Sequence, residues 1–248
     1  MKLISLKTLT ILIILIISLS SCASVQSSAM FRNSSVENRI LGSIAKLYIS
    51  KDGSDKYWGC TAYPVSRSSN KYIFLTAAHC VLIKDKNDKY TGKTAKRFLL
   101  SFKDYPEQDG KLYDAKLVAH EYDKIENKDF ALLEAYLPFY IPIIYLSSNE
   151  PTENQCVVNI GFPSKEKTRI HYGYVEKTYQ FENYFVVRLG GVLDPHGSSG
   201  SPIIECLSGK NVGIMVSVAS KNTPDKIIVF SWQSLREFLK SNNVSLDY

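Results

Sequence analysis

Several patterns that mark particular classes of protein are missing from this sequence. Lysine and arginine are scattered among acidic residues, and no run of like charge is long enough to indicate a nucleic-acid-binding patch. The cysteines and histidines show neither C-x-x-C nor H-x-x-x-H spacing, which zinc sites commonly use. No internal repeat or low-complexity tract is present. We therefore expect no nucleic-acid partner and no bound metal.

The amino-terminal apolar run is too short to span a bilayer, but it has the features of a secretory signal. Lys2 and Lys7 precede the apolar residues from Leu9 to Leu19, and small residues follow. Residues 1–21 are therefore predicted to be a signal peptide. Removing them lowers the formal net charge of +6 by two, which leaves a mildly basic protein.

The end of this signal, Leu19-Ser20-Ser21-Cys22, resembles the lipobox of bacterial lipoproteins, in which the cysteine becomes the lipidated first residue. Lipidation of Cys22 would attach the exported protein to a membrane, at the periplasmic or cell surface. Ordinary secretion after cleavage near Ala23, and an uncleaved anchor, are the alternatives. Residues 22–38, rich in serine, asparagine and alanine, are predicted to form a flexible tether.

The remaining chain is rich in short runs of Val, Ile, Tyr and Phe separated by Gly, Pro, Asn and Asp, which predicts an all-β body. Only the end of the chain has helical periodicity, with Trp232, Leu235, Phe238 and Leu239 on one face. The expected strands include Ile44–Ser50, Tyr72–Leu75, Phe98–Phe102, Cys156–Ile160, Phe185–Leu189, Val212–Val218 and Ile227–Phe230.

A serine enclosed by glycines, in Gly197-Ser198-Ser199-Gly200-Ser201-Pro202, is a candidate nucleophile. Glycine permits a tight bend that pushes one hydroxyl outward and turns backbone N–H groups toward the same point. Such groups can bind the negative oxygen that forms when a carbonyl is attacked. A hydroxyl is a weak nucleophile by itself, so this interpretation requires a histidine base and a group that orients it. A plain glycine–serine turn is the alternative.

The histidine is found in Leu75-Thr76-Ala77-Ala78-His79-Cys80, where it ends a strand-like run. The phrase T-A-A-H-C resembles the histidine signature of the chymotrypsin-like serine peptidases. That family carries its acid between the histidine and the serine, in a D-x-A-L-L-like strand, and Asp129-Phe130-Ala131-Leu132-Leu133 matches this pattern. The resemblance implies a catalytic triad of His79, Asp129 and Ser199.

The same resemblance implies the rest of the catalytic unit. Backbone N–H groups of Gly197 and Ser199 would form the oxyanion hole, and no cofactor is needed. The fold would be all-β, with two antiparallel six-stranded β-barrels over about residues 40–140 and 150–231 and a C-terminal α-helix over about 231–241. The peptidase domain would then occupy residues 39–248.

Activation by cleavage after Arg39 is one possibility, because Arg39-Ile40-Leu41-Gly42 looks like an activation junction. Trypsin-like enzymes carry an aspartate directly before the nucleophile, where it binds the new N-terminus. This chain has Ser198 there. We therefore expect a catalytic unit that forms without such cleavage.

Several turns and strands of the second half are similar to the glutamyl-endopeptidase branch of the family: Ile160-Gly161-Phe162-Pro163, Gly173-Tyr174-Val175 and Val212-Gly213-Ile214. That branch has a histidine directly after the Gly-Ile pair, where this chain has Met215, which argues against specificity for glutamate.

The resemblance places five residues in the primary specificity pocket: Leu193, Asp194, Val216, Ser217 and Val218. If Asp194 faces the pocket, a basic substrate side chain is favoured, because a buried carboxylate needs a paired charge. If Asp194 is a surface acid, Val216 and Val218 leave a small apolar slot. The sequence leaves both alternatives open.

Excluding Cys22, the even count of four cysteines fits two disulfides in an exported protein, and four cysteines permit three pairings. The resemblance implies a Cys60–Cys80 bridge, which would stabilise the fold by about 3 kcal/mol. It also implies a Cys156–Cys206 bridge, for which two free buried cysteines are the alternative.

The sequence as a whole thus predicts a monomeric serine endopeptidase that acts on protein or peptide substrates, exported and either lipid-anchored or secreted. A binding protein that keeps the fold without turnover is one alternative. An esterase that uses the same acyl-transfer chemistry is another.

Overall fold

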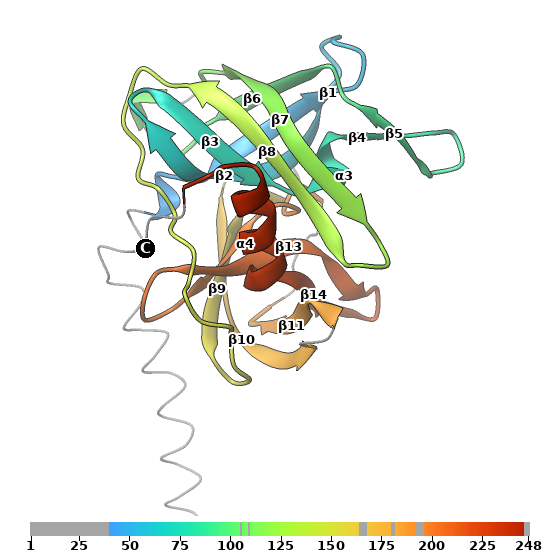
Figure 1. Cartoon of the computed structure of the whole chain (residues 1–248), viewed down its shortest axis with the longest axis vertical. Helices are drawn as coiled ribbons and strands as arrows, with labels where there is room; N and C mark the ends of the chain where they lie inside the picture. Colours follow the sequence, from blue (N-terminus) through green and yellow to red (C-terminus); the bar gives the residue numbers. More distant parts are fainter. Residues whose placement is uncertain are drawn as a thin grey trace, which may run out of the picture.

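Two closed antiparallel β-barrels of six strands each form the body of the protein, one above the other in Figure 1. This computed structural model describes residues 40–104, 106–108, 110–163, 168–179, 182–191 and 196–245. The all-β class with two six-stranded barrels, predicted from the sequence, is confirmed. The predicted signal peptide and tether, with Cys22, lie outside the described residues.

Barrel one has the strand order β1-β2-β3-β8-β7-β6. Its elements are β1 (Ala45–Ser50), β2 (Trp58–Ser68), β3 (Lys71–Thr76), the helical turn α3 (Ala78–Val81), β6 (Arg97–Ser101), the 3-10 turn η1 (Pro106–Gln108), β7 (Tyr113–Asp123) and β8 (Lys128–Tyr136). A separate two-stranded hairpin, β4 (Leu82–Lys84) with β5 (Tyr90–Thr94), projects to the side directly after α3.

Barrel two has the strand order β10-β11-β14-β13-β12-β9. Its strands are β9 (Cys156–Gly161), β10 (Arg169–Tyr179), β11 (Tyr184–Leu189), β12 (Pro202–Glu205), β13 (Asn211–Ser220) and β14 (Thr223–Ser231). The expected terminal helix is α4 (Trp232–Ser241). Among the described residues, no helix is long and apolar enough to cross a membrane.

The apolar run of β8 reflects burial on both faces of one strand. Ala131 and Leu133 face the interior of barrel one, whereas Phe130 and Leu132 join a second apolar cluster between the barrels. A strand buried on both faces loses the alternation of apolar and polar residues. This explains why D-F-A-L-L is almost entirely apolar after its acid.

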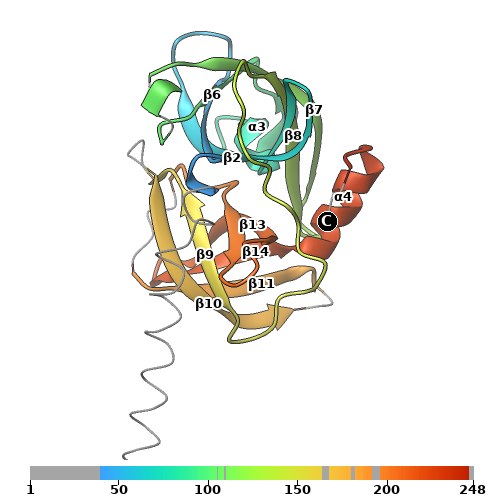
Figure 2. The same cartoon turned by 90° about the vertical axis from the view of Figure 1, so that its left-hand side faces the viewer.

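Helix α4 seals the outer edge of this inter-barrel cluster, and Figures 1 and 2 show it on the outside of the molecule. Its apolar face buries Leu235, Phe238 and Leu239, which recur at the three- and four-residue spacing of a helix. The Phe238 ring stacks on Phe130 of β8 with ring centroids 5.5 Å apart. The helix therefore fastens barrel two to barrel one.

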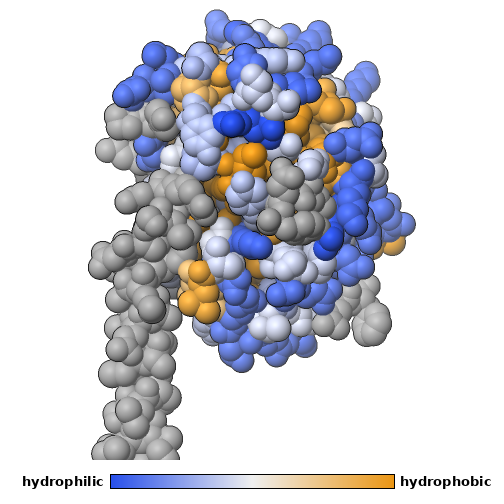
Figure 3. Space-filling view, turned by 60° about the vertical axis from the view of Figure 1, so that its left-hand side comes forward, coloured by the Kyte–Doolittle hydropathy of each residue, from blue (hydrophilic) through white to orange (hydrophobic). Residues whose placement is uncertain are grey.

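Hydrophobic side chains gather only in scattered patches on the face shown in Figure 3, among a mainly hydrophilic surface. The large apolar side chains lie instead in three buried clusters, one of them between the barrels. Burial of this apolar surface is the main force that holds the two barrels together.

A buried hydrogen bond also joins the barrels. The side-chain amide of Asn211, on β13, donates to the hydroxyl of Tyr63, on β2, at 2.7 Å, and both residues are fully buried. Burial raises the pKa of the Tyr63 hydroxyl, so it stays protonated. The Asn211 carbonyl oxygen accepts from the Gly213 N–H at 3.1 Å.

Tyr63→Phe is expected to lower the free energy of unfolding by about 1–3 kcal/mol, because it leaves a buried amide donor without this acceptor. Equilibrium urea denaturation of the purified protein measures the change. Tyr136→Phe is the matched control, since Tyr136 is 59% exposed and should change stability by less than about 0.5 kcal/mol. Equal effects of the two substitutions would contradict the role assigned to this hydrogen bond.

Candidate active site

His79 lies in the helical turn α3, directly after β3. The turn is one element that sequence periodicity did not predict, because four residues are too few to show a 3.6-residue pattern. It buries Ala78, Cys80 and Val81 and leaves the His79 side chain 21% exposed. The imidazole is thus held between the protein interior and solvent.

Asp129 begins the buried part of β8 and binds His79 through both carboxylate oxygens. Oδ2 lies 2.6 Å from His79 Nδ1, and Oδ1 accepts from the His79 backbone N–H at 2.7 Å. An ionised carboxylate only accepts hydrogen bonds, so Nδ1 carries the proton and Nε2 is left as the basic nitrogen. This is the tautomer that a general base needs.

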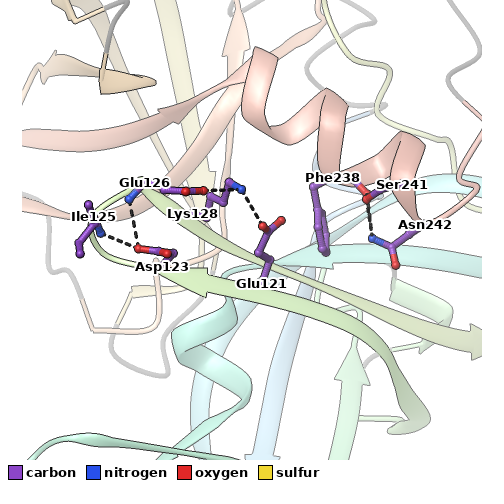
Figure 4. A network of polar contacts seen from close by, with 8 residues as sticks. All are labelled: Glu121, Asp123, Ile125, Glu126, Lys128, Phe238, Ser241 and Asn242. Atoms are coloured by element: carbon purple, nitrogen blue, oxygen red, sulfur yellow. Dashed lines mark hydrogen bonds and ion pairs between the residues drawn. The ribbon is translucent and has the colours of Figure 1, made fainter.

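The turn before Asp129 is stiffened by a network of polar contacts (Figure 4). The Lys128 ammonium binds Glu121 at 2.8 Å and Glu126 at 2.7 Å. These contacts raise the pKa of Lys128, and the hydrogen bond to Glu121 contributes most. The Asp123 carboxylate accepts from the N–H groups of Ile125 and Glu126. These contacts close the β7–β8 hairpin next to the carboxylate that holds His79.

Burial distinguishes the three serines of the glycine-rich loop. Ser198 and Ser201 are fully buried, whereas Ser199 is half-buried and lines a cleft together with His79 and Gly197. Ser201 is part of the interior of barrel two, where its hydroxyl accepts from the Asn159 amide at 2.6 Å. Of the three serines, only Ser199 lines the cleft.

Thr61 of barrel one fixes this loop of barrel two. Its hydroxyl donates to the Gly197 carbonyl oxygen at 2.8 Å, and its backbone N–H donates to the Ser199 carbonyl oxygen at 2.9 Å. The same hydroxyl accepts from the Phe162 N–H at 3.1 Å. These bonds fix the loop against β2, which pairs with β3, the strand that leads to His79. No motif in the sequence singled out Thr61, because a lone threonine in a strand carries no local signal.

Two clefts meet at His79. The first has a volume of about 430 Å³ and is also lined by Gly197, Ser199 and the Cys60–Cys80 disulfide. The second has a volume of about 590 Å³ and is also lined by Asp129, Val216 and Ser217. The β4–β5 hairpin borders both clefts through Lys84 and Tyr90. It comes directly after the histidine motif, and we did not predict it from the sequence.

Of the five residues expected in the primary pocket, three are described. Val216 and Ser217 line the second cleft, and Val218 packs against the interior cluster of barrel two. Leu193 and Asp194 lie outside the described residues, so the choice between a basic and a small apolar substrate side chain stays a prediction. Met215 is fully buried and lies beside Ser201 and Asn159.

Both pairs of cysteines form disulfides, in the pairing that the resemblance implied. Cys60–Cys80 closes the wall of the cleft beside His79, and Cys156–Cys206 joins β9 to the residue that follows β12. The sulfurs of Cys60 and Cys80 and a ring nitrogen of His79 lie within 4.8 Å of one another, a spacing that a metal site could use. Because the two sulfurs are bonded to each other, they offer no thiolate to a metal.

A sequence profile described as a trypsin-like peptidase domain matches residues 64–214, more than half of the chain. The chain belongs to the trypsin-like peptidase family. The matched segment contains His79, Asp129 and Ser199 and begins within β2. No curated protein matches this trypsin-like peptidase in sequence.

Solved structures of proteases share the fold of this trypsin-like peptidase. The active form of the Rv3671c protease from M. tuberculosis superimposes with a TM-score of 0.64 at 16% identity, over 87% of each chain. A serine endoprotease from Yersinia pestis has a TM-score of 0.60 at 16% identity, over 84% of this chain and 66% of its own. At this identity the likeness establishes the fold.

Gly200 of this trypsin-like peptidase combines a left-handed backbone, with a φ of +83°, and a close approach of other atoms. A Cβ there would be pressed against the Thr61 carbonyl oxygen and the Thr76 hydroxyl, and would lie 2.9 Å from the Ala77 nitrogen. Glycine is thus required both by the left-handed backbone and by the close approach of barrel one.

Gly200→Ala is expected to lower the free energy of unfolding by about 2–5 kcal/mol, from left-handed strain and overpacking combined. Gly92→Ala is the matched control, because Gly92 has a φ of +73° but open space around its Cα. Gly92→Ala should lower the free energy of unfolding by only about 1–2 kcal/mol, the cost of the left-handed backbone for alanine. Urea denaturation of both variants checks the difference, and equal losses would show that close approach at Gly200 is unimportant.

Proposed function

We propose that the protein is a serine endopeptidase that hydrolyses peptide bonds through His79, Asp129 and Ser199. The observation that carries the proposal is the 2.6 Å contact between Asp129 and His79 Nδ1, in a cleft that His79 shares with Ser199. Membership of the trypsin-like peptidase family supports the same chemistry.

In the proposed reaction, Ser199 Oγ attacks the carbonyl carbon of the substrate while His79 Nε2 takes its proton. The Asp129 carboxylate stabilises the imidazolium that forms, and backbone N–H groups of Gly197 and Ser199 bind the oxyanion. The C–N bond then breaks, and His79 gives its proton to the leaving amine. The product of this half-reaction is an ester between Ser199 and the acyl part of the substrate.

Water completes the proposed cycle. It attacks the ester carbon while His79 Nε2 accepts a proton, and the same proton returns to Ser199 Oγ as the C–O bond breaks. The carboxylic acid product leaves and Ser199 is regenerated. Every proton transfer in both halves uses the nitrogen that the Asp129 contact leaves unprotonated.

Two clefts that both border His79 support cleavage within a chain rather than at its end. One cleft borders Val216 and Ser217 of β13, where the resemblance places the acyl side of the substrate. The other borders Ser199 and the Cys60–Cys80 disulfide. An extended peptide could thus continue in both directions from the scissile bond.

Export and lipid anchoring at Cys22 complete the proposal. Two disulfides favour an oxidising compartment outside the cytoplasm. The lipobox-like Leu19-Ser20-Ser21-Cys22 supports acylation of the cysteine that would become the first residue. The tether that follows would let the peptidase domain reach substrates away from the membrane.

Ser199→Ala is expected to abolish covalent labelling by a fluorophosphonate probe, because only an activated serine attacks its phosphorus atom. Intact mass should show one adduct on the unsubstituted protein, mapped to Ser199 by peptide analysis. Ser198→Ala is the control, since Ser198 is a buried neighbour in the same loop, and it should still be labelled. If Ser199→Ala is labelled as strongly as the unsubstituted protein, the assignment of the nucleophile is wrong.

Cys22→Ala is expected to move the protein from the membrane fraction to the soluble exported fraction of expressing bacteria, because the acyl chains are lost. Immunoblots of fractionated cells check the distribution. Ser21→Ala is a control that keeps the cysteine and a small residue before it. An unchanged membrane fraction for Cys22→Ala would argue against the lipid anchor without bearing on the peptidase proposal.

A further inference from the structure

The two clefts that meet at His79 differ in charge. The first is lined by Lys51 and Lys84, and its described lining residues include no carboxylate. The second is lined by three lysines and three aspartates: Lys84, Lys124, Lys128, Asp88, Asp123 and Asp129. The described lining of the first cleft thus carries cationic side chains without carboxylates, whereas the lining of the second carries both signs.

The first cleft is the one that would receive the leaving segment of the substrate. The acyl segment is expected beside β13, and Val216 and Ser217 of that strand line the second cleft. The residues after the scissile bond must then continue on the opposite side of His79, past Ser199. The chain that departs with the amine therefore meets the cationic cleft.

Lys51 and Lys84 belong to different elements that converge on this cleft. The Lys51 ammonium lies 3.4 Å from the Lys84 carbonyl oxygen. The Lys84 ammonium lies over the Tyr90 ring, 5.1 Å from its centroid, and 2.9 Å from Asp88 Oδ1. Asp88 is 82% exposed and lines the other cleft. Because an exposed ion pair is weak, Asp88 competes only weakly with an anionic ligand of the first cleft for the Lys84 ammonium.

Apolar surfaces next to the Lys51 and Lys84 ammonium groups strengthen their attraction for an anion. Trp58, Leu82 and the Cys60–Cys80 disulfide line the same cleft, and the Trp58 indole N–H donates to the Cys80 carbonyl oxygen at 3.2 Å. Low-dielectric walls beside a charge reduce the screening by water. An anion that enters this cleft would be attracted more strongly than at an open lysine.

We propose that the leaving-segment cleft selects a carboxylate on the first or second residue after the scissile bond, through Lys51 and Lys84. This inference rests on the proposed function, because it names the substrate chemistry of the same site. The carboxylate could come from an aspartate or glutamate side chain, or from the free C-terminus of a short leaving segment. Both sources present one negative charge within two residues of the scissile bond.

The test uses amidated, internally quenched peptides that share one acyl segment, taken from the sites that the protein cleaves in a peptide library. They carry either aspartate or asparagine at the first or second position after the scissile bond. The kcat/KM ratio of aspartate to asparagine is expected to be about two- to tenfold, the range for one or two partly exposed ion pairs. It should fall as salt is raised from 0.05 to about 0.5 M.

The double variant Lys51→Gln/Lys84→Gln should bring this ratio close to one. Lys93→Gln is the matched control, because Lys93 is an exposed lysine of β5 that lines neither cleft, and it should keep the ratio. A second arm compares peptides that end one or two residues after the scissile bond as free acids or as amides. A preference for the free acid over the amide, with no preference for aspartate over asparagine, would show that the cleft binds the C-terminal carboxylate of the leaving segment.

The outcomes separate this inference from the proposed function. A ratio of one in the unsubstituted protein in both arms, with Ser199 still labelled by fluorophosphonate, overturns the carboxylate preference and leaves the peptidase intact. A ratio that persists in the double variant overturns the assignment to Lys51 and Lys84. Absence of both cleavage and labelling overturns the two proposals together.

Discussion

Apolar contact between the two barrels is the constraint on which the candidate site depends. His79 and Asp129 belong to barrel one, and Ser199 belongs to barrel two. Their relative position is therefore set by the layer that packs Phe130 and Leu132 against side chains of barrel two and α4. Each barrel has an apolar face whose exposure to water would be unfavourable. The two faces therefore pack on each other, which brings the His79 turn and the glycine-rich loop together.

Hydrogen bonds then convert this contact into a defined geometry. Hydrophobic burial is not directional, and it would tolerate small displacements of one barrel against the other. Thr61 removes that freedom, because its hydroxyl and its backbone N–H donate to the carbonyl oxygens of Gly197 and Ser199 in the glycine-rich loop. Gly200 permits the approach, since any side chain there would collide with barrel one. Asp129 holds His79 in the same way, by one short bond to the ring Nδ1 and one to the backbone N–H.

Much of this arrangement could be predicted because its signals are local. Each of the three motifs is a short run of consecutive residues that can be read without knowledge of the fold: T-A-A-H-C, D-F-A-L-L and G-S-S-G-S-P. The helical face of Trp232–Ser241 and the strand pattern are equally local, since they follow from periodicity. The β4–β5 hairpin, the turn α3 and the role of Thr61 were not predicted. A four-residue turn shows no period, and Thr61 acts on residues 136 positions away.

By itself, the sequence determined the strand-rich class, the order of the three motifs and the residue types available for acyl transfer. Only the tertiary structure decided which serine of the loop lines a cleft, because the burial of Ser198 and Ser201 depends on the folded chain around them. It also decided that Lys51 and Lys84 line one cleft together. Charges separated along the chain act on one ligand only after folding brings their side chains within a Debye length of it.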